Sequence, residues 1–296
     1  MRACPQYYRK ENNMAQFTNQ AQLTYNNTVT NSNIAIGEVI GALTASKTPV
    51  TDTYIQGDTV TYVVNLVNTA NNALNGLTVT DDLGAYEFNT NTVYPLTYTE
   101  GSVKYFINGV LQSAPTVNSD TGLIISGINV PADSNVAIVY ETTANQFAPL
   151  AEDSVITNTA TVSGGGITPI EASATITATN GPLLTITKAI SPIPVSENGT
   201  VTYTFTIQNL GNTDAVATDN VTLTDIFNPV LGNVTAAFNG TAWTEDTEYT
   251  YDEATGTFVS TSGAITVPAA TYTQDPDTGV WQVTPGTVTL VVTGTI

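Results

Sequence analysis

Apolar and polar positions alternate along many short segments of this chain, with a period of two residues. In the segment 200–207, four threonines alternate with Val201, Tyr203, Phe205 and Ile207. The same phase recurs earlier in the chain, at Val60, Tyr62, Val64 and Leu66. A period of two is typical of a β-strand with one face against a core and one in water. No stretch has a sustained 3.6-residue apolar period, so we predict an all-β protein.

The predicted strands recur in the same order in two halves of the chain. Three pairs of segments carry the likeness: 57–68 with 198–209, 77–83 with 221–227, and 134–144 with 286–296. A tandem duplication of this size predicts two β-sandwiches, each large enough to bury its own core. We assign residues 41–180 to the first sandwich and 181–296 to the second. Residues 1–16 form an N-terminal tail, and 17–40 a separate strand and spacer.

The two repeats differ in how they end. After Ala144 the first repeat continues through 155–178, where Ile156, Ala160 and Val162 share one face and predict a strand that closes the first sandwich. The second repeat reaches Ile296, which aligns with Ala144, without such a strand. We therefore predict that the second sandwich lacks its last strand.

A segment near the N-terminus matches the closing strand. Residues 17–25, FTNQAQLTY, resemble 156–164, ITNTATVSG. We predict that this segment is a donor strand, because an open sandwich edge is a template for strand addition. The predicted donor positions are Phe17, Asn19, Ala21, Leu23, Tyr25, Ile34 and Ile36. The predicted acceptor groove is bounded by the last strand, at Val288, Leu290 and Val292.

The Asn-rich segment 26–33, NNTVTNSN, is predicted to be the spacer after the donor strand. Eight residues span roughly 26 Å when fully extended, which is marginal for reaching back along a whole sandwich. We therefore expect the donor strand to enter another copy of the chain, and such a head-to-tail contact propagates into a fibre. Two alternatives stay open: a disordered tail with a coincidental likeness, and a strand swap that gives a closed monomer or dimer.

Several of these segments resemble a known family. The GDTVTY segment of the first repeat, Leu77 to Asp81, Val221 to Asp225 and Asn158 to Val162 are similar to the bacterial surface-protein repeat called domain of unknown function eleven. The resemblance covers roughly residues 43–178 and 181–296. It implies an immunoglobulin-like, Greek-key β-sandwich, and it implies no catalytic residues.

Charge and composition exclude several functions. The formal net charge is −19, so the chain would repel nucleic acid and anionic membranes. It has no histidine and a single cysteine, Cys4, which excludes histidine-dependent triads, cysteine-rich zinc sites and an internal disulfide. We predict no enzyme activity, no cofactor and no metal site. The acidic segment 275–279 is better explained as a hairpin turn than as a weak calcium site.

Two kinds of cross-link are considered. Cys4 is either an idle thiol or the source of a disulfide between subunits. Lys47 and Lys188 occupy equivalent positions, as do Asn19 and Asn158, so Lys–Asn isopeptide bonds are conceivable with Asp81 or Asp225 nearby. The alternative is that buried asparagine and strand-end lysine are ordinary structural features.

The N-terminus, MRACPQYYRKENN, has no apolar stretch typical of a secretory signal, and no segment approaches transmembrane length. We expect an extracellular protein or one on a cell or spore surface, released on lysis or by an unusual route, with Met1 or Met14 as the start. The predicted function is a structural subunit of a homopolymeric fibre, with other proteins only as anchor or tip. The alternative is an adhesin or stalk module, for which 270–285 with Tyr272 and Trp281 is the candidate ligand surface.

Overall fold

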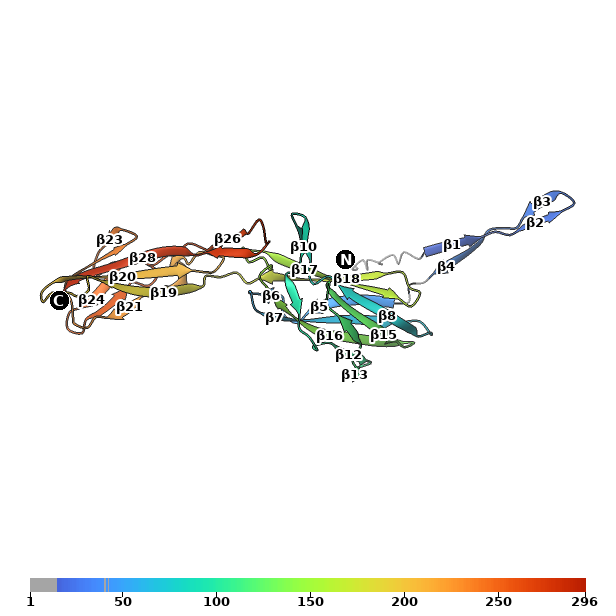
Figure 1. Cartoon of the computed structure of the whole chain (residues 1–296), viewed down its shortest axis with the longest axis horizontal. Helices are drawn as coiled ribbons and strands as arrows, with labels where there is room; N and C mark the ends of the chain where they lie inside the picture. The colour runs from blue at the N-terminus through green and yellow to red at the C-terminus, as the bar shows by residue number, and fades with distance from the viewer. Residues whose placement is uncertain (1–14, 40, 42) are drawn as a thin grey trace, which may run out of the picture.

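Two β-sandwiches lie end to end, and a β-hairpin projects beyond the first of them (Figure 1). The computed structural model describes residues 15–39, 41 and 43–296. These residues form strands joined by turns and one short 3-10 helix, Ala217–Asp219. The prediction of an all-β chain with tandem immunoglobulin-like sandwiches is confirmed. Within the described part of the chain, no helix has the length and hydropathy needed to span a lipid bilayer.

The first sandwich consists of two six-stranded sheets. One sheet contains β5 (Leu43–Pro49), β7 (Thr59–Asn68), β11 (Leu96–Tyr98), β12 (Lys104–Ile107), β13 (Val110–Leu111) and β16 (Ser134–Ala144). The other contains β6 (Thr53–Tyr54), β8 (Leu74–Asp81), β14 (Thr116–Asn118), β15 (Leu123–Val130), β17 (Val155–Gly164) and β18 (Ile170–Ala178). A small hairpin of β9 (Tyr86–Phe88) and β10 (Asn91–Val93) lies beside them. β17 is an interior strand of its sheet, between β8 and β18.

The second sandwich repeats the first sheet but has only part of the second. Its larger sheet contains β19 (Leu184–Ser191), β20 (Thr200–Asn209), β22 (Gly232–Phe238), β23 (Thr241–Trp243) and β28 (Gly286–Thr295). Its smaller sheet contains β21 (Thr224–Ile226), β24 (Tyr249–Asp252) and β25 (Thr257–Ser260), in the order β21-β25-β24. By the sequence repeat, β19 corresponds to β5 and β21 to β8. Among the described residues, this sandwich has no counterpart of β17 or β18.

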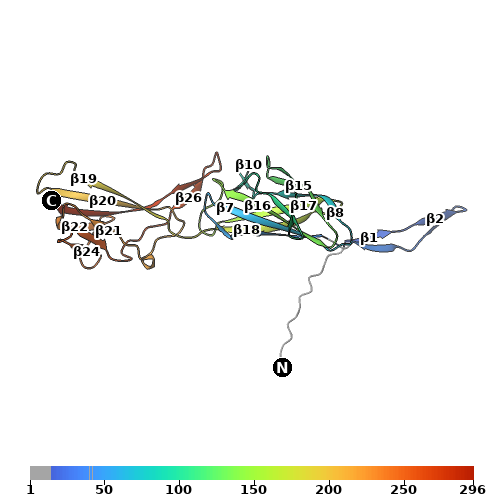
Figure 2. The same ribbon diagram turned by 90° about the horizontal axis from the view of Figure 1, so that it is seen from below.

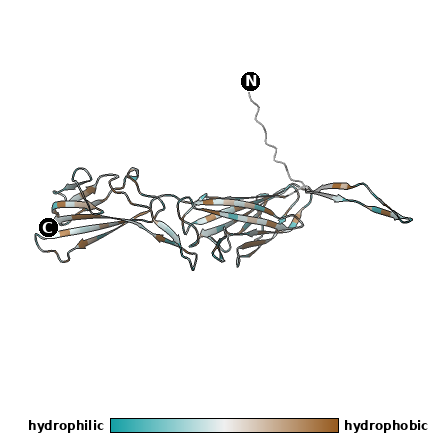
Figure 3. Cartoon of the chain, turned by 90° about the horizontal axis from the view of Figure 1, so that it is seen from above, coloured by the Kyte–Doolittle hydropathy of each residue, from teal (hydrophilic) through white to brown (hydrophobic). Residues whose placement is uncertain are grey.

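The predicted strand faces agree with the cores. In both β7 and β20 alternate residues are buried, including Tyr62 and Leu66 in the first sandwich and Tyr203 and Phe205 in the second. In Figure 3 apolar (brown) and polar (white or teal) segments follow one another along the strands of both sandwiches. Each sandwich has its own buried cluster. Each half of the chain therefore folds around a core of its own.

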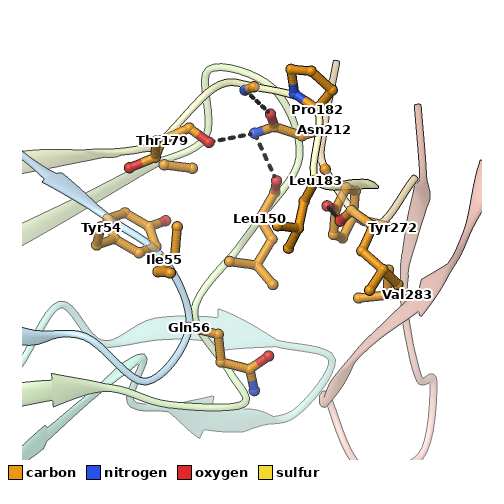
Figure 4. A pocket seen from close by; sticks show the side chains of 14 residues that line it. Tyr54, Ile55, Gln56, Leu150, Thr179, Pro182, Leu183, Asn212, Tyr272 and Val283 are labelled. Carbon is orange, nitrogen blue, oxygen red and sulfur yellow. Dashed lines mark hydrogen bonds between the residues drawn. The ribbon is translucent and has the colours of Figure 1, made fainter. Parts of the chain in front are cut away.

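A second hairpin braces the two sandwiches. β26 (Thr271–Gln274) pairs with β27 (Trp281–Thr284) and reaches from the second sandwich toward the first (Figure 2). The Trp281 backbone N–H donates to the Gln146 carbonyl (3.0 Å), and the Gln274 amide donates to the Tyr86 hydroxyl (2.8 Å). Beside this brace, a cavity of about 430 Å³ lies between the sandwiches (Figure 4). At its rim Asn212 donates to the carbonyls of Leu150 and Thr179.

The segment predicted to be a donor strand and spacer is a hairpin. β1 (Ala15–Asn19) pairs with β4 (Ala35–Val39), and β2 (Gln22–Tyr25) pairs with β3 (Thr28–Asn31). Asn26 (φ 46°) and Asn27 (φ 60°) form a two-residue turn with both φ values positive, as a type I′ hairpin turn requires. The predicted extended spacer 26–33 is therefore wrong, because its residues make the turn and the returning strand. The hairpin projects at the end of the first sandwich that is away from the second (Figures 1 and 2).

Candidate assembly site

The hairpin of β17 and β18 closes the first sandwich. β17 pairs antiparallel with β8, with Ala160 opposite Asp81 and Val162 opposite Val79. β18 pairs with the other edge of β17 and contacts β5 of the opposite sheet. The inward face of β17 is buried, as predicted for Ile156, Ala160 and Val162. Without this hairpin the edge of β8 and the inner face of β5 would be open.

A lysine–aspartate ion pair is buried beneath this hairpin. Lys47 Nζ of β5 lies 2.6 Å from Asp81 Oδ2 of β8, and both side chains are 0% exposed. The Tyr140 hydroxyl donates to the same carboxylate oxygen, and the Leu83 backbone N–H donates to the other (3.0 Å). The Lys47 ammonium also lies 4.8 Å from the centroid of the Tyr62 ring. A buried ion pair stays charged only when hydrogen bonds of this kind compensate for the lost water.

Asn158 of β17 belongs to the same cluster but makes no hydrogen bond. Its side-chain oxygen and nitrogen are buried and have no hydrogen-bond partner among the described residues, and the same is true of the Tyr62 hydroxyl. Asn158 lies two residues before Ala160, which is opposite Asp81, so it faces the same core. Buried side-chain amides without a partner are rare, because an unmade hydrogen bond costs free energy.

Two pKa values describe the environment of this cluster. Burial lowers the pKa of the Lys47 amine, and the Asp81 carboxylate opposes that effect. Burial raises the pKa of the Tyr62 hydroxyl, and the Asn158 amide opposes that effect. The core therefore contains a lysine whose charged form burial disfavours and a carboxamide without a hydrogen-bond partner among the described residues.

The second sandwich has an equivalent lysine and aspartate, which are partly exposed to solvent. Lys188 of β19 is equivalent to Lys47, and its ammonium pairs with Asp225 of β21, the equivalent of Asp81. These side chains are 40% and 19% exposed. The Lys188 Nζ lies 4.5 Å from the ring centroid of Tyr203 and 5.1 Å from that of Phe227. The described residues place no asparagine here that corresponds to Asn158.

Exposed apolar side chains flank Lys188 along β19, next to the free edge of β21. We name this open region the acceptor groove and define it by Ile186, Lys188 and Ile190 of β19, by Leu223 just before β21, and by Asp225 in β21. Ile186 and Ile190 are exposed although their counterparts in β5 face the closed core. Exposed apolar side chains beside an unpaired strand edge are typical of a site for strand addition.

The predicted location of the groove is corrected by this arrangement. Val288, Leu290 and Val292 belong to β28, which pairs with β20 on one side and β22 on the other. All three side chains are buried in the core of the second sandwich. They therefore lie in a closed sheet and do not border an open groove, because the missing strand belongs beside β21.

The N-terminal hairpin presents most of the predicted donor residues to solvent. Asn19, Ala21, Leu23 and Tyr25 are exposed, and Leu23 is 65% exposed. The side chain of Phe17 lies outside the described part of the structure. Ile34 and Ile36 are exposed too, but Ile36 pairs with Thr18 and so lies on the face opposite Asn19, which pairs with Ala35.

Other predicted positions have simpler roles. Cys4 lies outside the described residues. Tyr272 donates to the Leu210 carbonyl (2.7 Å), and Trp281 Nε1 donates to the Tyr86 hydroxyl (3.3 Å), so both serve the brace between the sandwiches. Asp275 accepts hydrogen bonds from the backbone of Asp277 and Thr278, as expected for a turn. The described residues contain no acidic, histidine or cysteine cluster able to hold a metal ion.

No protein-family model matches the chain, and no curated protein sequence does. Solved structures of similar fold include the full-length major pilin RrgB of Streptococcus pneumoniae, at 14% identity and a TM-score of 0.35 over 84% of this chain and 42% of that one. BcpA, the major pilin subunit of Bacillus cereus, is similar at 11% identity and a TM-score of 0.35 over 92% and 73%. A collagen-binding domain from a Staphylococcus aureus adhesin is similar at 15% identity and a TM-score of 0.29 over 46% and 97%. These likenesses are in the β-sandwich fold alone.

Proposed function

We propose that this protein is the structural subunit of an extracellular fibre on a cell or spore surface. In this fibre the N-terminal hairpin, residues 15–39, of one copy closes the second sandwich of the next copy. The observation that carries the proposal is the internal hairpin of β17 and β18. It fills in the first sandwich the position that is open in the second, and its sequence resembles the N-terminal hairpin.

The internal hairpin also supplies the register of the contact between copies. In the first sandwich Ala160 is opposite Asp81 and Val162 is opposite Val79. Transferred by the sequence repeat, Ala21 of one copy lies opposite Asp225 of the next, and Leu23 lies opposite Leu223. The strand β4 then packs against β19, as β18 packs against β5. The exposed Ile186 and Ile190 become covered in this way.

The positions of the two parts favour closure between copies. The hairpin projects at one end of the molecule and the acceptor groove lies in the sandwich at the other end (Figure 1). A contact between two different surfaces at opposite ends does not close on itself, so it propagates into a linear polymer. Such a polymer is made of identical subunits and requires other proteins only at its ends, as an anchor or a tip.

The test compares two truncations of the chain by negative-stain microscopy. The full chain and a variant that lacks residues 1–13 are expected to form fibres, because both retain the hairpin. A variant that lacks residues 1–39 should stay a folded monomer, since the groove persists and the donor is gone. Added in small amounts to the full chain, it should shorten the fibres by occupying the ends that display a free hairpin. Fibres formed by the variant without residues 1–39 would contradict the proposal.

A further inference from the structure

The first sandwich contains the components of an amide-exchange reaction. Lys47 supplies an amine, Asn158 supplies a carboxamide, and Asp81 contacts the lysine within a cluster of tyrosine side chains. In a buried pair, transfer of a proton from the lysine to the aspartate replaces two charges by two neutral groups, which a site of low dielectric favours. The neutral amine is a nucleophile, and the protonated aspartate is an acid.

An equivalent amine and carboxylate lie in the second sandwich, and an equivalent carboxamide lies in the N-terminal hairpin. Lys188 and Asp225 lie in the acceptor groove in the positions of Lys47 and Asp81. Asn19 lies in the hairpin at the position of Asn158, with Ala35 as its cross-strand partner where Asn158 has Ala174. Insertion of the hairpin in the register of the internal copy therefore brings Asn19 to Lys188 and Asp225.

We propose that assembly joins Lys188 of one copy to Asn19 of the next through a covalent amide bond, by the reaction that Lys47, Asp81 and Asn158 support within the first sandwich. This inference rests on the proposed function, because the two side chains meet only at a junction between copies. The covalent bond at each junction between copies then forms without an added enzyme.

The reaction balances with ammonia as its second product. The neutral Nζ of Lys188 attacks the Cγ of Asn19, while the protonated Asp225 donates its proton to the carboxamide. The C–N bond of the carboxamide then breaks, and its nitrogen leaves as ammonia with the proton given up by the attacking amine. Asp225 lends its proton to the carboxamide oxygen and takes it back when the C=O bond re-forms, so it acts as a catalyst. No oxidant, reductant or cofactor is consumed.

The exposure of Lys188 explains why the reaction waits for assembly. In the free chain water reaches Lys188 and Asp225, whose side chains are 40% and 19% exposed. The rings of Tyr203, Phe205 and Phe227 already surround one side of the ammonium. The inserted hairpin covers the remaining side, as β17 covers Lys47, and so creates the buried environment of the internal site.

The test is to boil assembled fibres in detergent and reducing agent, and to separate the products by size. The parent chain should give a ladder of covalent multimers, and peptide mass spectrometry should find Lys188 linked to Asn19 with the loss of one ammonia. Lys188→Arg keeps the positive charge beside Asp225 but cannot form this amide, and it and Asn19→Ala should each form fibres that dissociate into monomers on boiling. Thr18→Ala, on the opposite face of the strand, is the control and should keep the ladder.

A mixture of the two variants sharpens the test. Lys188→Arg retains Asn19 and Asn19→Ala retains Lys188, so a mixture should give covalent dimers and nothing longer. Parent fibres that dissociate into monomers on boiling would overturn this inference and leave the proposed function standing. A ladder that persists in Lys188→Arg would overturn it too. Absence of fibres in every variant and in the parent would instead overturn the proposed function and this inference with it.

Discussion

Lys47 and Lys188 occupy equivalent positions in the two repeats, and each pairs with an aspartate. The two ion pairs differ in their contribution to stability, because their burial differs. The pair of Lys47 with Asp81 is inaccessible to water, whereas Lys188 and Asp225 are partly exposed. Loss of one partner in a buried pair leaves a charge without water or counter-charge, whereas an exposed pair contributes little.

A matched pair of substitutions tests this difference. In the variant without residues 1–39, Lys47→Met should lower the free energy of unfolding of the first sandwich by at least about 3–5 kcal/mol, because Asp81 stays buried without its lysine partner and no amide bond to Asn158 can form. Lys188→Met should change that of the second sandwich by less than about 1 kcal/mol. Urea unfolding followed by tryptophan and tyrosine fluorescence measures both. Equal effects of the two substitutions would contradict the assignment of one site as closed and the other as open.

The sequence alone placed these lysines in equivalent positions but could not distinguish their burial. Their local sequences are similar, and the difference arises from whether a strand far along the chain covers them. The missing hydrogen bonds of Asn158 were equally inaccessible to sequence analysis, because they depend on which groups the fold brings together.

At the scale of single elements, the period of two predicted most strands and the inward face of β17 correctly. The sequence repeat predicts the acceptor groove beside the last strand of the chain, and this location is wrong. In the fold β28 is an interior strand, and the closing strand pairs instead with the counterpart of β8, much earlier in the repeat. Strand order within a sandwich depends on long-range pairing that a linear repeat does not reveal.

The sequence does contain an indication of the hairpin turn, within the segment 26–33 that we predict to be a spacer. Asn26 and Asn27 adopt positive φ, a conformation that asparagine tolerates better than most residues. Two consecutive asparagines between alternating segments therefore predict a tight turn. The correction changes the expected donor from one strand to two, which matches the internal hairpin of β17 and β18.

The donor strand supports a prediction that depends on its face. Leu23 is expected to enter the groove opposite Leu223, so Leu23→Asp would bury an unpaired carboxylate. We expect this substitution to weaken assembly by roughly 3–5 kcal/mol, or about two to four orders of magnitude in affinity. Sedimentation of the full chain at matched salt concentrations measures the effect.

Gln22→Asp provides the control for this substitution. Gln22 pairs with Asn31 and points away from the face of Leu23, so its replacement adds only surface charge, which salt screens. Assembly should stay close to that of the parent. If Gln22→Asp were the more damaging change, the strand would enter the groove with the other face inward.

For the whole molecule, the brace of β26 and β27 distinguishes the junction within a chain from the junction between copies. The brace contacts the first sandwich through Tyr86 and Gln146. The segment of the first sandwich that corresponds to it, near Pro131, contains no such hairpin among the described strands. The fibre should therefore bend more between copies than within them.

The two tryptophans of the chain test the role of the brace. Trp281→Ala should broaden the range of angles between the sandwiches, because it removes the hydrogen bond to Tyr86 and the packing around it. Trp243, which stacks on Phe238 away from the junction, is the control. Small-angle X-ray scattering of the variant without residues 1–39 should show a wider distribution of maximum dimensions for Trp281→Ala alone. Unchanged scattering would assign the rigidity to the linker near Asn212.

The positions of the two lysine–asparagine sites have a mechanical consequence. Lys47 lies in the first strand of its sandwich and Asn158 in the strand that leads out of it. With both amide bonds formed, a pull along the fibre travels from Lys47 to Asn158, along β18 and β19 to Lys188, and then into the next copy at Asn19. Residues 48–157 and 189–296 lie outside this route, so the bulk of each sandwich bears no tension. A fibre built in this way resists stretching as a covalent chain does, whatever the thermodynamic stability of the sandwiches attached to it.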